Sequence, residues 1–226
     1  MITIYYANFN NQLVFQEPIS IIKNYTQNTW QRQFLKCPAW LQQNKNTFGI
    51  KSTQEFSITS KDGTFTSDYS PEWCERNIEV RDRDTCSFEK ATIFFTMEDS
   101  LIVEQRAPVL ENNDIKTKTT LVEGAFDLGK WPRPFECAVI FNQNDTIKVF
   151  EDDIIYYVKF HTNEKIKFQK FLATEEIQEM LRMPADTRKL LDINKAKIKP
   201  LEYFYSLIDP KRYKKIVYKK IKENLL

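Results

Sequence analysis

The sequence predicts a mainly β protein: an antiparallel β-sandwich or barrel, jelly-roll-like, with a C-terminal α-helical appendage. Three observations lead to this fold class. Short runs of β-branched and aromatic residues recur along residues 1–171, with turn residues between them. Aromatic residues make up 14% of the chain, which supplies material for a core. After residue 171 the apolar spacing becomes helical. We therefore expect a β-rich domain over 1–171 and a helical appendage over 172–226, packed on that domain or on a partner.

Alternation of apolar and polar residues, the period of a half-buried strand, marks the expected strands at 48–51 and 55–59, and runs of β-branched and aromatic residues mark the others. Between two of them Asp62-Gly63 predicts a tight hairpin, because a type I′ turn needs positive φ at both central positions. The expected strands lie at residues 2–5, 13–15, 48–51, 55–59, 86–88, 92–96, 101–104, 135–141, 146–150 and 154–160.

The helical appendage begins with a capping signal. The Thr174 hydroxyl is a suitable N-cap, and two glutamates follow in the first turn, where the helix dipole favours negative charge. Pro184 ends this first helix and Pro200 begins a second one. A last segment places its apolar residues on one stripe: Tyr213, Ile216, Val217, Ile221 and Leu225.

Basic residues surround that stripe, and residues 211–222 contain no acidic residue. One interpretation is a helix that packs by its apolar stripe and keeps its lysines in water. The other is an electrostatic contact with phosphate groups. We expect at most weak, non-specific nucleic-acid contact here, through Lys211, Arg212, Lys214, Lys215, Lys219 and Lys220.

The residue inventory excludes several chemistries. Four glycines are too few for a glycine-rich phosphate loop, and a single histidine, His161, rules out a two-histidine metal triad within one chain. The four cysteines have no CxxC spacing and are expected to be reduced and mostly buried. Acidic clusters at 82–84 and 151–153 are interpreted as solvated turns. We expect no metal and no cofactor.

The stretch from Val122 to Pro134 concentrates glycine, proline and tryptophan. Asp127, Lys130, Trp131 and Arg133 are its candidate ligand-binding residues, because an indole face and a guanidinium suit a planar or anionic group. The alternative is a rigid crossing between strands, with Trp131 in the core and Arg133 paired to Asp127.

A second aromatic stretch runs from Trp30 to Trp40. It surrounds Cys37-Pro38 and suits either a core corner or a shallow pocket, so Trp40 is a further candidate for ligand binding.

Several of these motifs occur in an order that resembles a known family. They are Cys37-Pro38, the run Asn46-Thr47-Phe48-Gly49-Ile50-Lys51-Ser52, then Ile93-Phe94-Phe95, and Gly124-x-Phe126-Asp127-x-x-x-Trp131-x-Arg133-Pro134. Over roughly residues 28–170 the chain resembles uncharacterised proteins of tailed phages, especially those of marine cyanobacteria, with bacterial relatives. The resemblance implies a viral accessory protein with a β-rich fold. It transfers no catalytic residue.

Together these features favour a non-catalytic phage accessory or structural protein that binds a ligand or partner. The alternative is an enzyme that uses carboxylates and Arg133 on a small molecule or sugar in the mouth of a barrel. We expect a protein partner or self-association. Neither a signal peptide nor an apolar run long enough to span a bilayer occurs, so we expect a cytoplasmic location, in the host cell or the virion.

Overall fold

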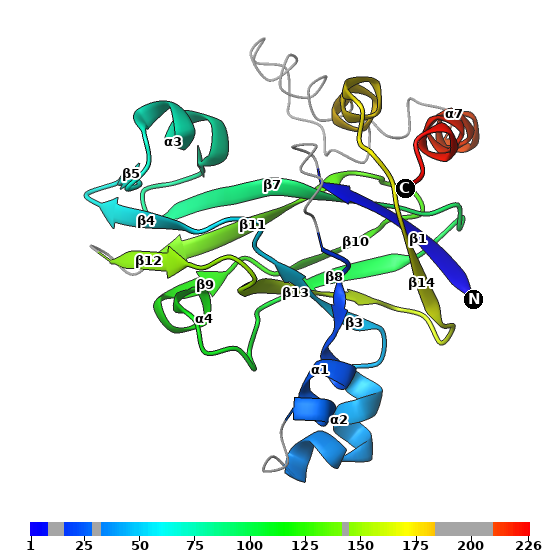
Figure 1. Cartoon of the computed structure of the whole chain (residues 1–226), viewed down its shortest axis with the longest axis horizontal. Coiled ribbons are helices and arrows are strands. Elements are labelled where there is room, and N and C mark those ends of the chain that lie inside the picture. The colour runs from blue at the N-terminus through cyan, green and yellow to red at the C-terminus, as the bar shows by residue number, and fades with distance from the viewer. Residues whose placement is uncertain (9–15, 29–32, 142–144, 184–209) are drawn as a thin grey trace, which may run out of the picture.

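Two β-sheets face each other at the centre of the computed structural model, which describes residues 1–8, 16–28, 33–141, 145–183 and 210–226 (Figure 1). The first sheet has the order β14 (Ile166–Lys170), β1 (Ile2–Asn8), β7 (Thr85–Phe95), β11 (Pro134–Phe141) and β9 (Thr119–Leu121), and β6 (Glu79–Val80) also pairs with β7. The second has the order β10 (Gly124–Asp127), β8 (Ile102–Arg106), β13 (Ile154–Phe160), β3 (Thr47–Lys51) and β2 (Ile19–Ser20).

A small third sheet lies at one end of the sandwich. It contains β12 (Thr146–Val149), β4 (Phe56–Lys61) and β5 (Thr64–Thr66), in that order. The predicted hairpin joins β4 to β5. Its central residues, Asp62 and Gly63, have φ values of 51° and 82°, as a type I′ turn requires.

The main core fills the space between the two large sheets. On β1, Ile2, Ile4 and Tyr6 point into this core, while Tyr5 and Ala7 contact a separate cluster on the outer face. On β11, every second side chain from Phe135 to Phe141 is buried. This period-2 burial is that of a strand with one face on the core.

Helices cover part of the outer face of the first sheet. Residues 175–183 form one helix, and α7 (Pro210–Glu223) lies beside it (Figure 1). Val217 and Ile221 of α7 are fully buried in a cluster with Tyr5 of β1 and Phe95 of β7. The tail therefore packs on the β-sandwich. The helix predicted from Pro200 lies outside the described residues.

Short helices also cover the outer face of the second sheet. They are α1 (Ile21–Asn28), the 3-10 helix η1 (Gln33–Lys36) and α2 (Pro38–Gln43). Ile21 packs on Ile154 and Tyr157 of β13. Glu111 links α1 to β13, because the hydroxyls of Tyr25 on α1 and Tyr157 on β13 both donate hydrogen bonds to its carboxylate.

The predicted fold class is confirmed: the chain is mainly β, with mostly antiparallel sheets and a C-terminal helix. Among the described strands the pairing orders are open paths, so no sheet closes into a barrel, which favours the sandwich of the two alternatives. One pair, β1 with β14, is parallel. The strand predicted at 13–15 lies outside the described residues.

The sequence did not predict several elements within residues 1–171. These are the helices α1, α2, α3 (Pro71–Asn77) and α4 (Asp114–Lys118), and the strands β2, β9, β10 and β14. These helices have eight residues or fewer, which is too short for the helical spacing of apolar residues to be recognised in the sequence.

Candidate binding groove

The stretch at 122–134 contains β10 and the turn that follows it. The Asp127 carboxylate, at the end of β10, accepts hydrogen bonds from the Leu101 amide at 2.9 Å, the Gly129 amide at 3.0 Å and the Ser100 hydroxyl at 2.7 Å. Lys130 Nζ lies 3.3 Å from the same carboxylate. Asp127 therefore ties the turn to the start of β8.

The electrostatics of Asp127 agree with this structural role. Burial by itself raises the pKa of the carboxyl, but the hydrogen bonds from Ser100 and Leu101, together with the Lys130 ammonium, outweigh burial and hold the pKa below its usual value. A carboxylate with its oxygens occupied in this way is a poor general acid or base.

The other candidate residues do not converge on Asp127. The Arg133 guanidinium lies 4.8 Å from the centre of the Phe126 ring, a cation–π contact, so the interpretation that paired it with Asp127 is wrong. Trp131 is half-buried rather than a core residue. Trp40 is half-buried on α2, a helix without buried residues, and α2 lies well apart from β10 (Figure 1).

Two of the six basic residues predicted for nucleic-acid contact are occupied. Lys214 is 6% exposed and its ammonium donates to the Glu98 carbonyl. Lys220 pairs with Glu176 at 2.9 Å, which ties α7 to the neighbouring helix. Both therefore serve the packing of α7. Lys215 and Lys219 are exposed, as are Lys211 and Arg212 at the start of the helix.

An open groove of about 580 Å³ runs between one edge of each large sheet, and the sequence had not indicated it. Its walls are β14, from the first sheet, and β2 with the segment before it, from the second. We call it the edge groove. It is lined by Met1, Gln16, Glu17, Pro18, Ile19, Ser20, Lys23, Phe48, Lys51, Lys165, Ile166, Lys167 and Phe168.

The edge groove has an apolar floor and a basic rim. Phe48 and Phe168 meet edge to face on the floor, with ring centres 4.8 Å apart, and both are half-buried. Four lysines line the groove against one glutamate, Glu17. No carboxylate among the described residues pairs with the ammonium groups of Lys23, Lys165 or Lys167, so these charges are available to a ligand.

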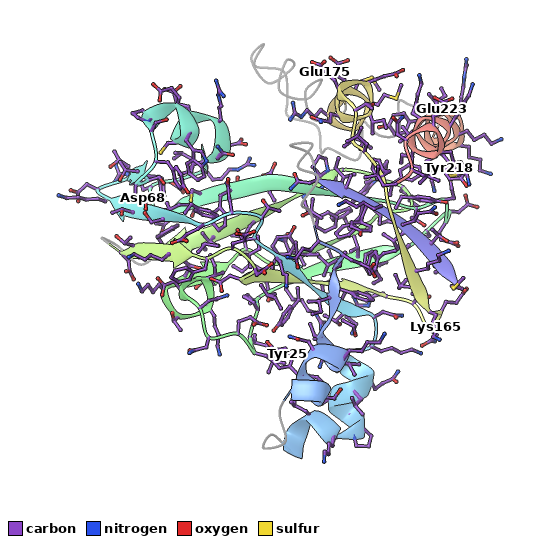
Figure 2. All side chains as sticks on the ribbon, in the orientation of Figure 1. Tyr25, Asp68, Lys165, Glu175, Tyr218 and Glu223 are labelled. Carbon is purple, nitrogen blue, oxygen red and sulfur yellow. The ribbon has the colours of Figure 1, made fainter. Side chains whose placement is uncertain are left out.

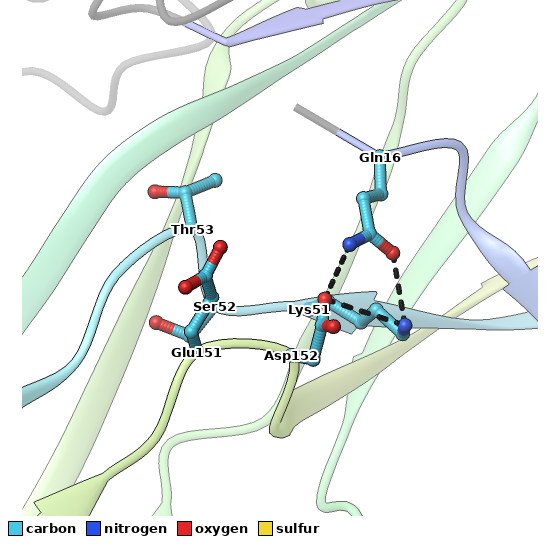
Figure 3. Close-up of a pocket in the computed structure, with 6 residues that line it drawn as sticks. All are labelled: Gln16, Lys51, Ser52, Thr53, Glu151 and Asp152. Carbon is cyan, nitrogen blue, oxygen red and sulfur yellow. Dashed lines mark hydrogen bonds and ion pairs between the residues drawn. The ribbon is translucent and has the colours of Figure 1, made fainter. Parts of the chain in front are cut away.

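A polar cluster closes one end of the groove. Gln16 donates to Asp152 and accepts from Lys51 Nζ at 2.8 Å, while Lys51 Nζ lies 3.4 Å from Asp152 (Figure 3). Asp152 has a φ of 72°, so the β12–β13 turn holds its carboxylate there at some conformational cost. Lys51 is thus partly neutralised. The small pocket beside this cluster holds about 10 Å³, the space of a single water.

A second charged cluster lies on the outer face of the second sheet. Glu104 is 2.7 Å from His161 Nε2 and 2.9 Å from Arg106 Nε. The Glu104 carboxylate thus contacts both the Arg106 guanidinium and the His161 ring. In the part of the chain that the structure describes, no three His, Cys, Asp or Glu side chains gather as a metal site would require.

The sequence held a signal for the groove that the strand search missed. Lys165-Ile166-Lys167-Phe168 alternates charged and apolar residues, as a strand with one wet face does. Its register and its place at a sheet edge depend on pairing with β1, more than 160 residues away in the sequence.

No protein-family model, no curated protein and no solved structure matches this chain. Among the described residues, none of the helices combines the length and apolar character needed to cross a bilayer.

Proposed function

We propose that this protein is a non-catalytic binding module, an accessory or structural protein of a tailed phage, and that the edge groove is its binding site. On this proposal it acts in the host cytoplasm or the virion. The phage assignment rests on the resemblance of residues 28–170. The site assignment rests on one observation. The groove is large enough to hold a ligand, its floor is aromatic, and lysines without an ion-pair partner in the described part of the chain lie on its rim.

The composition of the groove specifies the kind of ligand. Lysine ammonium groups attract an anion, and the half-buried phenylalanines offer apolar surface. A ligand that satisfies both is anionic and partly apolar.

The enzymatic alternative is less well supported by the geometry. It needs carboxylates and Arg133 to face a common substrate, whereas Arg133 lies on Phe126 and the nearby Asp127 carboxylate is held by its own turn. Among the described residues, those that line the groove include one carboxylate, Glu17, and no histidine or cysteine. Binding is therefore the function that this groove serves best.

An anionic aromatic dye, 8-anilinonaphthalene-1-sulfonate, provides a direct test. We expect saturable, blue-shifted fluorescence with the native protein. The variant Lys23→Gln/Lys165→Gln should bind more weakly, because it removes from each side of the groove a positive charge that has no ion-pair partner within the described ranges. The matched control, Lys61→Gln/Lys116→Gln, changes two exposed lysines on β4 and α4 and should bind like the wild type. Equal binding by all three proteins would refute the groove assignment.

A second candidate function, weak nucleic-acid contact, is favoured by the exposed side of α7. Lys211, Lys215, Lys219 and Lys222 are spaced to lie along one side of the helix, and all four are exposed. Binding of a random-sequence duplex DNA should then fall steeply with salt and be reduced in Lys215→Gln/Lys219→Gln. Binding that ignores salt and these substitutions would exclude α7 as the contact.

A further inference from the structure

The hydrogen bonds of β14 leave one of its edges open. Ile2 N–H donates to the Lys165 carbonyl at 2.9 Å and Phe171 N–H donates to the Tyr6 carbonyl at 3.1 Å, which fixes the parallel ladder. In this register residues 165, 167 and 169 face β1. The amide and carbonyl groups of Ile166 and Phe168 therefore point away from β1, and no described strand pairs with them.

Directly after β14, the same edge of the chain already pairs with the C-terminal residues. Leu226 N–H donates to the Lys170 carbonyl at 3.1 Å, and Leu172 N–H donates to the Asn224 carbonyl at 2.9 Å. These bonds form an antiparallel bridge between Phe171 and Leu225. An added extended segment is thus compatible with the surroundings of this edge, and the bridge stops where the groove begins.

The side chains of β14 present two different surfaces to an added strand. Ile166 and Phe168 pack toward the core at the groove floor. Lys167 is exposed on the opposite face of the strand, and Lys165, also exposed, lies at the N-terminal end of β14 (Figure 2). Because neighbours on paired strands share a face, an added strand meets apolar side chains at alternate positions and lysines at the others.

The charge of an added strand determines whether it can pair favourably with β14. A second copy that paired antiparallel through its own β14 would bring Lys167 near its equivalent, and like charges directly opposite are unfavourable. An acidic strand places carboxylates against Lys165 and Lys167 instead. Lys23 adds positive charge from the other wall of the groove.

We infer that the open edge of β14 is a strand-addition site for an acidic extended peptide of a partner protein, with apolar and acidic residues in alternation. This inference rests on the proposed function and names its ligand class. Main-chain hydrogen bonds to Ile166 and Phe168 hold the peptide, its apolar residues contact Phe48 and Phe168, and its carboxylates pair with Lys165 and Lys167.

The test uses a fluorescein-labelled synthetic peptide of alternating glutamate and valine, measured by fluorescence anisotropy with the full chain. A matched peptide with lysine in place of glutamate should not bind. Lys165→Glu/Lys167→Glu should lower the affinity on the order of tenfold or more, as loss and reversal of two cross-strand charge pairs implies. The control Lys61→Glu/Lys116→Glu makes the same change in charge far from β14 and should leave the affinity unchanged.

A proline substitution tests the main-chain hydrogen bonds between β14 and the peptide. Ile166→Pro removes an amide that β1 does not use, which an edge strand tolerates. Ile166→Ala removes the side chain and keeps the amide. The proline variant should bind several-fold more weakly than the alanine variant. If Ile166→Pro does not fold, hydrogen exchange in the wild type replaces it, and the peptide should slow exchange of the Ile166 and Phe168 amides.

Each contrary result has a distinct meaning. Peptide binding without a difference between the two Ile166 variants, or without amide protection, overturns strand addition. Failure of the peptide to bind while the anilinonaphthalene dye still binds overturns this inference and leaves the groove assignment standing. Failure of both overturns both. Displacement of the peptide by single-stranded oligothymidylate at lower concentration than by unlabelled peptide would identify the groove as a nucleic-acid site and overturn the inference.

Discussion

Two residues of the 122–134 stretch act on the backbone rather than on a ligand. The Asp127 carboxylate binds two amides and a hydroxyl, and Gly129 allows the turn to lie directly against residues 98–100. Two of the four glycines of the chain fall in this stretch. The sequence did not indicate that Gly129 in particular is needed, because that depends on its contact with residues 98–100.

Gly129 and Gly124 differ in the space around them, which gives a matched pair of substitutions. A Cβ on Gly129 would lie 2.7 Å from the Glu98 carbonyl oxygen and from backbone atoms of Ser100, whereas a Cβ on Gly124 has nothing within 4 Å. Gly129→Ala should lower the free energy of unfolding by about 1–3 kcal/mol. Gly124→Ala should change it by less than about 0.5 kcal/mol. Urea denaturation measures both, and similar values for the pair would contradict the contact.

The four cysteines should differ strongly in reactivity. Cys37 is exposed, and hydrogen bonds from the Trp40 and Ala39 amides lower the pKa of its thiol. Burial raises the pKa of Cys86 to about 12, and Cys137 is also buried. Since the thiolate is the nucleophile, Cys37 should react first with Ellman's reagent, and Cys37→Ser should remove the fast phase. A fast phase that survives in Cys37→Ser would show that another thiol reacts first.

At the scale of elements, the sequence predicted those with a long apolar or alternating pattern of their own and missed those defined by their neighbours. β11 buries every second side chain, β13 is apolar except for Lys159, and both were placed almost to the residue. β10 and β14 are shorter, and what makes each a strand is its partner, β8 or β1. The edge groove belongs to the second kind, because pairing over long sequence distances builds both of its walls.

The packing of α7 can be tested with two isoleucines of the same helix. Ile221 is fully buried against the first sheet, while Ile216 is 45% exposed. Ile221→Ala should lower the free energy of unfolding by about 2–5 kcal/mol through lost burial and a new cavity. Ile216→Ala should change it by less than about 0.5 kcal/mol. Equal and small losses would show that α7 does not depend on this apolar contact in solution.

At the scale of the whole molecule, composition and periodicity were sufficient for the fold class and for the helical tail. They were insufficient for the division into sheets, because strands adjacent in sequence, such as β10 and β11, lie in different sheets. The candidate site was likewise not predictable. Its lysines come from segments around residues 23, 51 and 166, and only the assembled sandwich brings them to one groove.

The titratable groups across the molecule predict how its stability depends on pH. The pKa values of Asp68, Asp114 and Asp127 lie below their usual value, so each carboxylate contributes stability that is present above the pKa of the unfolded chain. That contribution is lost as the pH falls through the lower pKa of the folded state. We therefore expect the free energy of unfolding to decrease below about pH 4.

At high pH, the stability of the fold decreases as the pH rises. Burial raises the pKa of Tyr5 and of Tyr6 from 10.0 to about 12, and that of Cys86 from 9.0 to about 12. These groups are neutral in the folded protein, so their contribution is complete below the unfolded pKa and is lost as the pH rises toward 12. Urea denaturation followed by circular dichroism should give a plateau of stability from about pH 5 to 9, with losses on both sides. A maximum at or below pH 4, or a stability that stays constant up to pH 12, would contradict this assignment of buried groups.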